Sequence, residues 1–281
     1  MCGEDDEDKI YGAHMGDKHS DSWRIMVGNL GTLPNERTGH GKIKIDKWKN
    51  LVTKNIDLNI ISELNKDMGI LPQEDRIESI AKGWWDGLMC RSAFLREPDR
   101  ALRTLRQPGG VALLSNGKCT SHIVDQGGDD RNLGRWRWMT LRGKDQKKIC
   151  IIGAYKTGAS WVTTQNQLVA LQDGRVGTSA IDTDPTELWV SDLRTFIQKQ
   201  QNEQCNIILT GDFNEDVSVP GTDIVQLATS LGLREALIEK YGNAPNTHDR
   251  GFLPIDGIFV SEGIQILQGG YTTFEESPSD H

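Results

Sequence analysis

Residues that could carry chemistry follow apolar runs at separated points of this chain. Residues 207–210 lead into Gly-Asp212-Phe-Asn214, and the chain ends on Ser-Asp280-His281. An apolar run that breaks into Gly-Asp-x-Asn is typical of a buried strand with two polar side chains at its end. Carboxylate, amide and imidazole groups together suit metal-assisted attack of water on phosphorus.

Four other apolar runs also end in or carry a polar residue. In chain order these residues are Asn29, Glu63, Tyr155 and Asp256. Gly-Asp-x-Asn alone is weak evidence, because Asp and Asn are common turn formers after any strand. Ligands tend to bind outside strand ends, so the repeated pattern predicts a site at the edge of a sheet.

Six ordered motifs, from Asn29 to Asp280-His281, resemble those of the endonuclease/exonuclease/phosphatase superfamily over about residues 23–281. Asn246-Thr247-His248, upstream of the run around Asp256, resembles the endonuclease domains of non-LTR retrotransposons. The resemblance implies an α/β fold, a four-layer αββα sandwich with two packed mixed β-sheets flanked by helices. It also implies a metal-dependent hydrolase that nicks the DNA backbone by in-line attack of water.

The resemblance assigns Glu63, Asn29 and Asp280 to a Mg²⁺ ion, with Mn²⁺ as a substitute. Hard divalent cations prefer carboxylate oxygen, which makes Glu63 the best candidate for direct coordination. Asn29 offers either its amide oxygen to the metal or its amide N–H to phosphate, and its residue type leaves both open.

The resemblance assigns Asp212, Asn214, Asp256, His281 and Tyr155 to catalysis. Asp212 orients or deprotonates the attacking water, or protonates the leaving oxygen, and the sequence does not choose between these roles. Asn214 holds the nucleophile or a phosphoryl oxygen. Asp256 orients His281, which bonds a phosphate oxygen or acts as acid or base, and Tyr155 donates its hydroxyl to phosphate.

DNA binding is predicted from the alternation of Arg135 and Arg137 with Trp136 and Trp138. In a strand this alternation gives one basic face and one aromatic face. Arginine supplies sequence-independent contacts to phosphate, and tryptophan can stack on a base. The opposing interpretation places both tryptophans in the core and leaves the arginines solvated.

Two further features lie elsewhere in the chain. A second arginine-rich strip runs over residues 91–106. His248 has Asp249 and Arg250 as neighbours, and its context favours a loop residue in a polar network.

Composition limits the function classes. The chain has 281 residues and a net charge of −8, but its first 21 residues hold seven acidic and two basic residues. We therefore expect a disordered acidic tail at 1–21 and an endonuclease/exonuclease/phosphatase domain at 22–281. The nearly neutral domain leaves room for DNA binding through local basic strips.

Cysteine spacing and hydropathy indicate the compartment. The five cysteines are widely separated, so they form neither a disulfide framework nor a zinc motif. The acidic N-terminus has no apolar run and no stretch approaches a membrane span, so neither a signal peptide nor membrane association is expected. These features predict an intracellular protein, nuclear or cytoplasmic.

Helical and strand patterns interleave along the chain. Strands are predicted at residues 23–29, 58–62, 109–115, 136–141, 148–155, 206–210, 258–260 and 264–269. Helices are predicted at residues 46–55, 73–82, 165–173, 186–201, 223–230 and 234–241. Several strands are polar on one side, which favours two packed sheets over a single parallel sheet.

The chain stops inside its Ser-Asp-His motif, which indicates a truncated C-terminus. An α-carboxylate beside His281 would oppose phosphate binding. The retrotransposon resemblance implies a longer polypeptide that continues into a reverse transcriptase. Two other functions stay open: a phosphatase or phosphodiesterase for a small phosphorylated substrate, and a catalytically inactive retroelement remnant that only binds.

Overall fold

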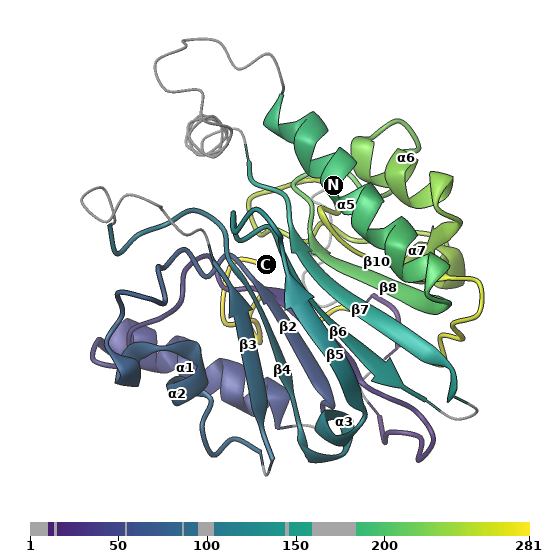
Figure 1. Ribbon diagram of the computed structural model, residues 1–281. Coiled ribbons are helices and arrows are strands. Elements are labelled where there is room, and N and C mark those ends of the chain that lie inside the picture. Colours follow the sequence, from purple (N-terminus) through teal and green to yellow (C-terminus); the bar gives the residue numbers. More distant parts are fainter. Residues whose placement is uncertain are drawn as a thin grey trace, which may run out of the picture.

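Two mixed β-sheets pack face to face between layers of helices in the computed structural model (Figure 1). The predicted four-layer sandwich is therefore confirmed. The structure describes residues 11–13, 16–53, 55–85, 87–94, 104–143, 146–158 and 184–281. Residues 1–10 of the predicted tail, the predicted helix at 165–173, and most of the arginines of the 91–106 strip lie outside these residues.

The first sheet has four strands in the order β1-β2-β4-β3. Their bounds are Ile25–Asn29 for β1, Leu58–Ser62 for β2, Met89–Ala93 for β3 and Val111–Ser115 for β4. β1 and β2 are parallel, and β4 runs antiparallel to both β2 and β3. Asn29 and Ser62 are paired at the carboxyl ends of the two parallel strands.

The second sheet has six strands in the order β5-β6-β7-β8-β10-β9. Their bounds are Ile123–Gly128 for β5, Trp136–Arg142 for β6, Lys148–Tyr155 for β7, Cys205–Asp212 for β8, Leu233–Glu235 for β9 and Asp256–Ser261 for β10. Only β7 and β8 are parallel, and the register aligns Tyr155, Asp212 and Asp256 side by side across β7, β8 and β10. Three polar strand ends therefore meet at one edge.

Helices cover the outer faces of both sheets (Figure 1). On the four-stranded sheet lie α1, Gly39–Val52, and α2, Ile77–Ile80, which follows the short 3₁₀ helix η2, Gln73–Asp75. On the six-stranded sheet lie α5, Pro185–Asn202, and α6, Asp223–Ser230. The short helices α3, Gly117–Ser121, and α7, Ala236–Tyr241, close the connections after β4 and β9.

Alternation along the central strands fills three apolar layers. In β4, Val111 and Leu113 face the space between the sheets, while Ala112 and Leu114 face α1 and α2. A third layer joins β7 and β8 to α5 and α6. All residues of β2 and β4 are buried, so these two strands have no solvent-exposed side. Two helix-covered sheets explain this pattern, because each sheet then has apolar packing on both faces.

Two of the predicted elements differ from the structure. α1 begins at Gly39 rather than at Asp46, because the Thr38 hydroxyl accepts a hydrogen bond of 3.0 Å from Gly41 N and caps the helix. Residues 264–269 do not form the predicted strand. The carbonyls of Ile264 and Ile266 instead accept hydrogen bonds from the side chains of Arg234 and Lys240.

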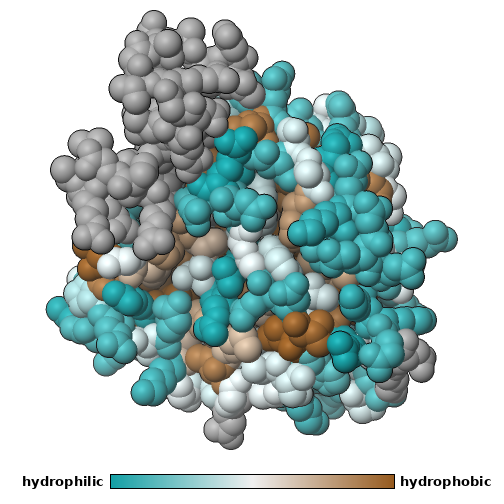
Figure 2. Space-filling model, viewed as in Figure 1, coloured by the Kyte–Doolittle hydropathy of each residue, from teal (hydrophilic) through white to brown (hydrophobic). Residues whose placement is uncertain are grey.

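One face of the molecule is mostly hydrophilic, with hydrophobic residues exposed in separate small patches (Figure 2). Among the described helices, none combines the length and the apolar character needed to cross a bilayer.

Candidate active site

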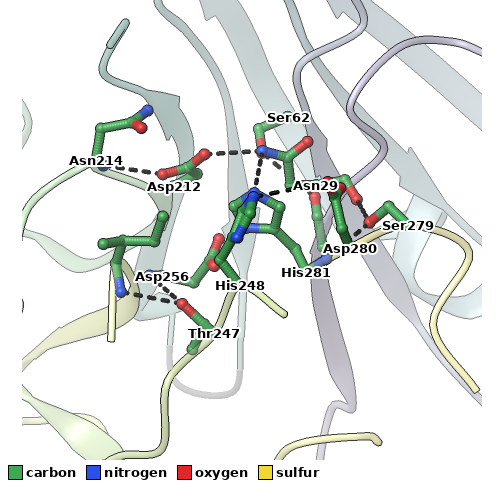
Figure 3. A network of polar contacts seen from close by, with 12 residues as sticks. Asn29, Ser62, Asp212, Asn214, Thr247, His248, Asp256, Ser279, Asp280 and His281 are labelled. Carbon is green, nitrogen blue, oxygen red and sulfur yellow. Dashed lines mark hydrogen bonds and ion pairs between the residues drawn. The ribbon is translucent and has the colours of Figure 1, made fainter. Parts of the chain in front are cut away.

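Polar residues from both sheets meet at the edge where β1, β2, β7 and β8 end and β10 begins (Figure 3). The C-terminal Ser-Asp-His segment lies against the end of β1, where the Ser279 hydroxyl donates to the Asn29 carbonyl. Most of the predicted catalytic set is thereby brought together from segments that are far apart in the chain.

A chain of hydrogen bonds connects four of these residues. Asn29 Nδ2 donates to Asp212 Oδ2 at 2.8 Å and lies 3.3 Å from His281 Nε2. His281 Nδ1 lies 2.9 Å from Asp256 Oδ2. Asn29 Oδ1 accepts from Gly31 N at 2.6 Å, which fixes the amide with its N–H groups toward Asp212 and His281. This arrangement uses Asn29 as a donor, so the predicted role of its amide oxygen as a metal ligand is not supported by the amide orientation.

The Gly-Asp-x-Asn turn is formed by unusual backbone angles. Gly211 has φ 144°, and a Cβ there would lie 1.8 Å from the Ala154 carbonyl oxygen, so only glycine fits. Asn214 has φ 50°, its backbone N donates to Asp212 Oδ1 at 2.9 Å, and its side chain donates to Lys156 O at 2.7 Å. Both oxygens of Asp212 therefore accept N–H donors, which fixes the carboxyl group.

Burial, together with the charge of Asp256 directly opposite on β10, raises the pKa of Asp212 from 3.8 to about 8. His281 and the Asn214 backbone N–H oppose the shift without cancelling it. A carboxyl group with such a pKa exchanges its proton near neutral pH, as a general acid or base must.

Burial alone would lower the pKa of His281, but the hydrogen bond and charge of Asp256, with further help from Asp212 and Asp280, raise it from 6.5 to about 9. The Asn29 contact acts in the opposite direction. A proton on Nε2 would face the Asn29 N–H group, which points at the same atom. His281 is therefore held between groups that favour opposite protonation states.

Tyr155 and Glu63 form a second pair at this edge. The Tyr155 hydroxyl donates to Glu63 Oε1 at 2.5 Å. Burial and the Glu63 charge raise the pKa of Tyr155, so the hydroxyl stays protonated as a donor. Glu63 itself has φ 55°, an uncommon conformation for a side-chain-bearing residue that often marks functional sites.

The donor set fits a divalent cation. Ligand atoms of Asp212, Asp256 and His281 lie within 4.8 Å of one another, as do those of His248, Asp280 and His281. Asp256 Oδ1 is buried and has no hydrogen-bond partner within the described part of the chain. An unpartnered buried carboxylate oxygen is what a bound cation would satisfy. Neither group contains Glu63, whose role as a ligand stays a prediction.

The loop before β10 holds two residues that sequence reasoning undervalued. Thr247 Oγ1 accepts from Ile255 N and Asp256 N, both at 3.0 Å, and so positions the start of β10. The His248 ring lies edge-on to the His281 ring, with 4.9 Å between the centroids. The Asn-Thr-His motif could have indicated that both residues lie near the site, because it precedes the run that carries Asp256.

Lys156, which directly follows Tyr155, was missed altogether. Its buried amine binds Glu215 and Asp223, and its backbone carbonyl accepts from Asn214. It therefore supports the turn after β8. No local pattern marks it except its position after a predicted site residue.

The predicted DNA-binding face is wrong for Arg135 and Trp136. Arg135 is 2% exposed, donates to both oxygens of Asp129 at 2.7 Å, and reaches Asp192 at 2.8 Å. Trp136 is buried in the layer under α5. The interpretation that assigns the tryptophans to the core holds for Trp136, but Arg135 is buried rather than solvated.

The other two residues of that segment are half-buried. Trp138 packs on Phe196, with 5.4 Å between the ring centroids. Burial and the neighbouring Arg91 lower the pKa of Arg137. Their predicted contacts with DNA stay predictions.

Sequence comparison finds no matching protein-family model and no matching curated protein. Comparison of structures finds related folds. Xenopus laevis APE2 catalytic domain superimposes with a TM-score of 0.59 at 14% identity, covering 92% of this chain and 88% of that one. The 3′ phosphatase NExo from Neisseria, bound to product DNA hairpin, gives 0.54 at 18% identity, covering 86% and 87%.

A third solved structure is named after the endonuclease/exonuclease/phosphatase family. It is an endonuclease/exonuclease/phosphatase family protein from Leptotrichia buccalis, with a TM-score of 0.54 at 14% identity, covering 87% of this chain and 89% of that one. Identities this low establish the shared fold alone. This chain therefore has the fold of the endonuclease/exonuclease/phosphatase proteins.

Proposed function

We propose that this chain is a divalent-cation-dependent phosphodiesterase that nicks a DNA strand by attack of water on phosphorus. One observation carries the proposal: the hydrogen-bonded series Asp212–Asn29–His281–Asp256 at the joined edge of the two sheets. It combines a carboxyl group of raised pKa, an amide donor and a carboxylate-bound imidazole. Phosphoryl transfer to water requires such groups around one phosphate.

Carboxylates of this edge would hold Mg²⁺, or Mn²⁺ in its place. Asp280, Glu63 and the unpartnered Oδ1 of Asp256 are the candidate ligands. When bound, the cation supplies positive charge that neutralises the phosphoryl oxygens and polarises the phosphorus centre.

Side chains of the protein carry out proton transfer and position the reacting groups. Asp212 takes a proton from the attacking water or gives one to the leaving oxygen, and its raised pKa suits either direction. Asp256 holds His281 with Nε2 toward Asn29 and the phosphate position. Tyr155 stays protonated and holds Glu63 through its hydroxyl, so a hydrogen bond from Tyr155 to phosphate would require this contact to open. Asn214 keeps the Asp212 turn in place.

DNA is the substrate we favour. The structure of NExo with product DNA hairpin documents that the same fold accommodates DNA. The loop beside the site also carries Arg250, with its side chain 85% exposed, and Phe252, 94% exposed. An exposed cation and an exposed aromatic ring near the scissile position suit a polymer with phosphates and bases.

A small phosphorylated substrate is the second candidate. The burial of Arg135 and Trp136 removes part of the expected DNA surface, and the net charge of −8 repels a polyanion. The Asn246-Thr247-His248 segment beside the site supports a retroelement endonuclease, and continuity with a reverse transcriptase belongs to that same proposal. The mutual contacts of the proposed catalytic residues argue against an inactive remnant.

A comparison of two substrates tests the proposal. Hydrolysis of bis(4-nitrophenyl) phosphate, a small phosphodiester, and nicking of supercoiled plasmid would be measured with Mg²⁺ and with EDTA. We expect Mg²⁺-dependent activity on both, with plasmid nicking that falls steeply as salt rises because phosphate contacts release counterions. Activity on the small ester with no plasmid nicking at any salt concentration would select the second candidate. Inactivity on both would contradict the phosphodiesterase.

A further inference from the structure

His248 occupies a position that the proposed mechanism does not use. Its ring lies against His281, and its Nε2 lies 3.6 Å from Asp280 Oδ2. We propose that His248 is a second imidazole of the active site, which donates its Nε2–H to a non-bridging oxygen of the bound phosphate. This inference rests on the proposed phosphodiesterase function and adds a substrate-contacting residue to it.

Hydrogen bonding within the loop selects the tautomer of His248. The backbone N–H of Arg250 donates to His248 Nδ1 at 3.1 Å. A ring nitrogen that accepts a hydrogen bond carries a lone pair, so the proton of the neutral imidazole lies on Nε2. The nitrogen nearest Asp280 is therefore an N–H donor.

The loop around His248 is tied down at several points. Gly251 N donates to His248 O at 2.9 Å, which closes a turn. The Asn246 side chain donates to the carbonyls of His248 and Gly251 at 3.3 and 3.2 Å. Asp249 N donates to Asp280 O at 2.8 Å, which joins the loop to the C-terminal motif. The donor is thus held in place before substrate binds, as electrostatic catalysis requires.

The Nε2–H group is available to a ligand. The His248 side chain is 29% exposed, and the separation of 3.6 Å from Asp280 Oδ2 is too long for a hydrogen bond. Figure 3 shows the His248 ring beside His281. A phosphate that contacts His281 Nε2 would therefore lie next to this second donor.

An anion fits this position better than a cation does. His248, Asp280 and His281 have ligand atoms close enough to hold a metal ion. A metal bond at His248 Nε2 would require the proton to move to Nδ1, where it would face the Arg250 N–H group. The loop geometry therefore favours an N–H donor to an oxyanion at Nε2.

Two substitutions separate the two nitrogens of His248. In His248→Asn the amide oxygen can replace Nδ1 as acceptor for Arg250 N–H, but nothing replaces Nε2–H. In His248→Gln the amide N–H₂ can reach the Nε2 position, but the acceptor near Arg250 is lost. If His248 binds phosphate, His248→Asn lowers kcat for bis(4-nitrophenyl) phosphate by about 10- to 100-fold, the effect expected for one hydrogen bond to a charged group. His248→Gln then recovers most of the lost rate, although its loop is less stable.

The opposite order would overturn the inference. If His248 only supports the loop, His248→Asn retains the rate and His248→Gln loses it. Equal rates for both variants and the unaltered chain would also contradict a role in phosphate binding. Thermal unfolding of each variant shows whether the loop change affects folding, since a lowered Tm is expected for His248→Gln only.

Nitrogen NMR of the histidine rings supplies a readout that does not depend on turnover. We expect His248 in the unaltered protein to show the Nε2–H tautomer, and added inorganic phosphate to shift its Nε2 resonance. The NMR measurement remains informative even if the chain hydrolyses no diester. Failure of the proposed function is therefore distinguishable from failure of the inference. An Nδ1–H tautomer, or an Nε2 resonance that saturating phosphate leaves unchanged, would rule out the donor.

Discussion

The edge around Asp212 and His281 and the segment from Arg135 to Trp138 are both rich in charged, polar or aromatic residues. They differ in how their polar atoms are used. Arg135 has two carboxylate partners and lies in the interior, so its charge is neutralised within the fold. At the Asp212 edge, Asp212 and Asp256 lie opposite each other and Asp256 Oδ1 has no partner among the described residues. Incompletely neutralised carboxylates, rather than charge itself, distinguish the candidate active site.

The largest effect is expected at Asp212. Asp212→Asn keeps the shape and an acceptor for Asn214 N–H but removes the titrating group, so Mg²⁺-dependent nicking should fall by about 10²- to 10⁴-fold. The free energy of unfolding should change by less than about 2 kcal/mol, because removal of the buried acid opposite Asp256 offsets the new amide N–H that faces the Asn29 donor. Rates and urea unfolding measure the two effects. A strongly destabilised Asp212→Asn variant would make Asp212 a structural residue like Arg135.

Removal of Arg135 should act on stability alone. Arg135→Met leaves Asp129 buried without its main partner, which costs about 3–5 kcal/mol of unfolding free energy. The control is Arg131→Gln, which removes a half-exposed pair with Asp192 and should cost less than about 1 kcal/mol. Urea unfolding compares them. If Arg135→Met were as stable as Arg131→Gln and lost affinity for DNA, the prediction of a DNA-binding Arg135 would be restored.

Asp256→Asn tests the orientation of His281. The amide can still accept from His281 Nδ1, but it lacks the charge that stabilises the imidazolium, so kcat should fall by about 10- to 100-fold. Ring-nitrogen NMR should show a lowered pKa of His281, since Asp256 supplies the main upward shift. An unchanged pKa would mean that Asp256 does not act through His281.

Stability of the metal-free protein should depend on pH through this edge. Folding raises the pKa of His281 from 6.5 to about 9 and that of Asp212 from 3.8 to about 8. Both raised values stabilise the native state most below the unfolded pKa, and this stabilisation is lost as pH rises through the folded pKa. We therefore expect Tm in EDTA to fall between pH 6.5 and 9. Asp212→Asn should reduce the fall, and a Tm that rises over this range would contradict the electrostatics.

The smallest effect is expected at Arg250, on the exposed loop beside the site. If Arg250 contacts one phosphate, Arg250→Gln should reduce the slope of log affinity against log salt by about 1 and change kcat little. Fluorescence anisotropy with a labelled DNA duplex measures this slope, and Lys199→Gln on α5 provides the matched charge control. An unchanged slope for Arg250→Gln would remove this loop from the DNA surface.

Much of the candidate site is readable from the sequence because buried strands leave a strong pattern. The runs before Asn29, Tyr155 and Asp212 are strands. Parallel pairing aligns Tyr155 with Asp212 in one sheet and Asn29 with Ser62 in the other, and packing of the two sheets brings these ends to one edge. The sequence could not show that Gly31 N–H fixes the Asn29 amide, or that Thr247 and Lys156 support the site, because these contacts depend on chain reversal and packing.

Two of the errors share one physical origin: partners that are distant in sequence. The alternation around Arg135 predicted an exposed basic face, but Asp129 and Asp192 neutralise the guanidinium within the core. Residues 264–269 have an apolar pattern, but the side chains of Arg234 and Lys240 donate hydrogen bonds to backbone carbonyls that would otherwise pair with a neighbouring strand. Local pattern gives the periodicity of a segment, while its hydrogen-bond partners come from the tertiary fold.

The most direct test is the initial rate of plasmid nicking in Mg²⁺ and in EDTA, for the unaltered chain, Asp212→Asn and the exposed control Asp130→Asn. The account predicts nicking that requires Mg²⁺, is retained in Asp130→Asn and is lost in Asp212→Asn. Nicking that persists in EDTA, or that Asp212→Asn retains, would contradict a metal-dependent hydrolase at this edge of the two sheets.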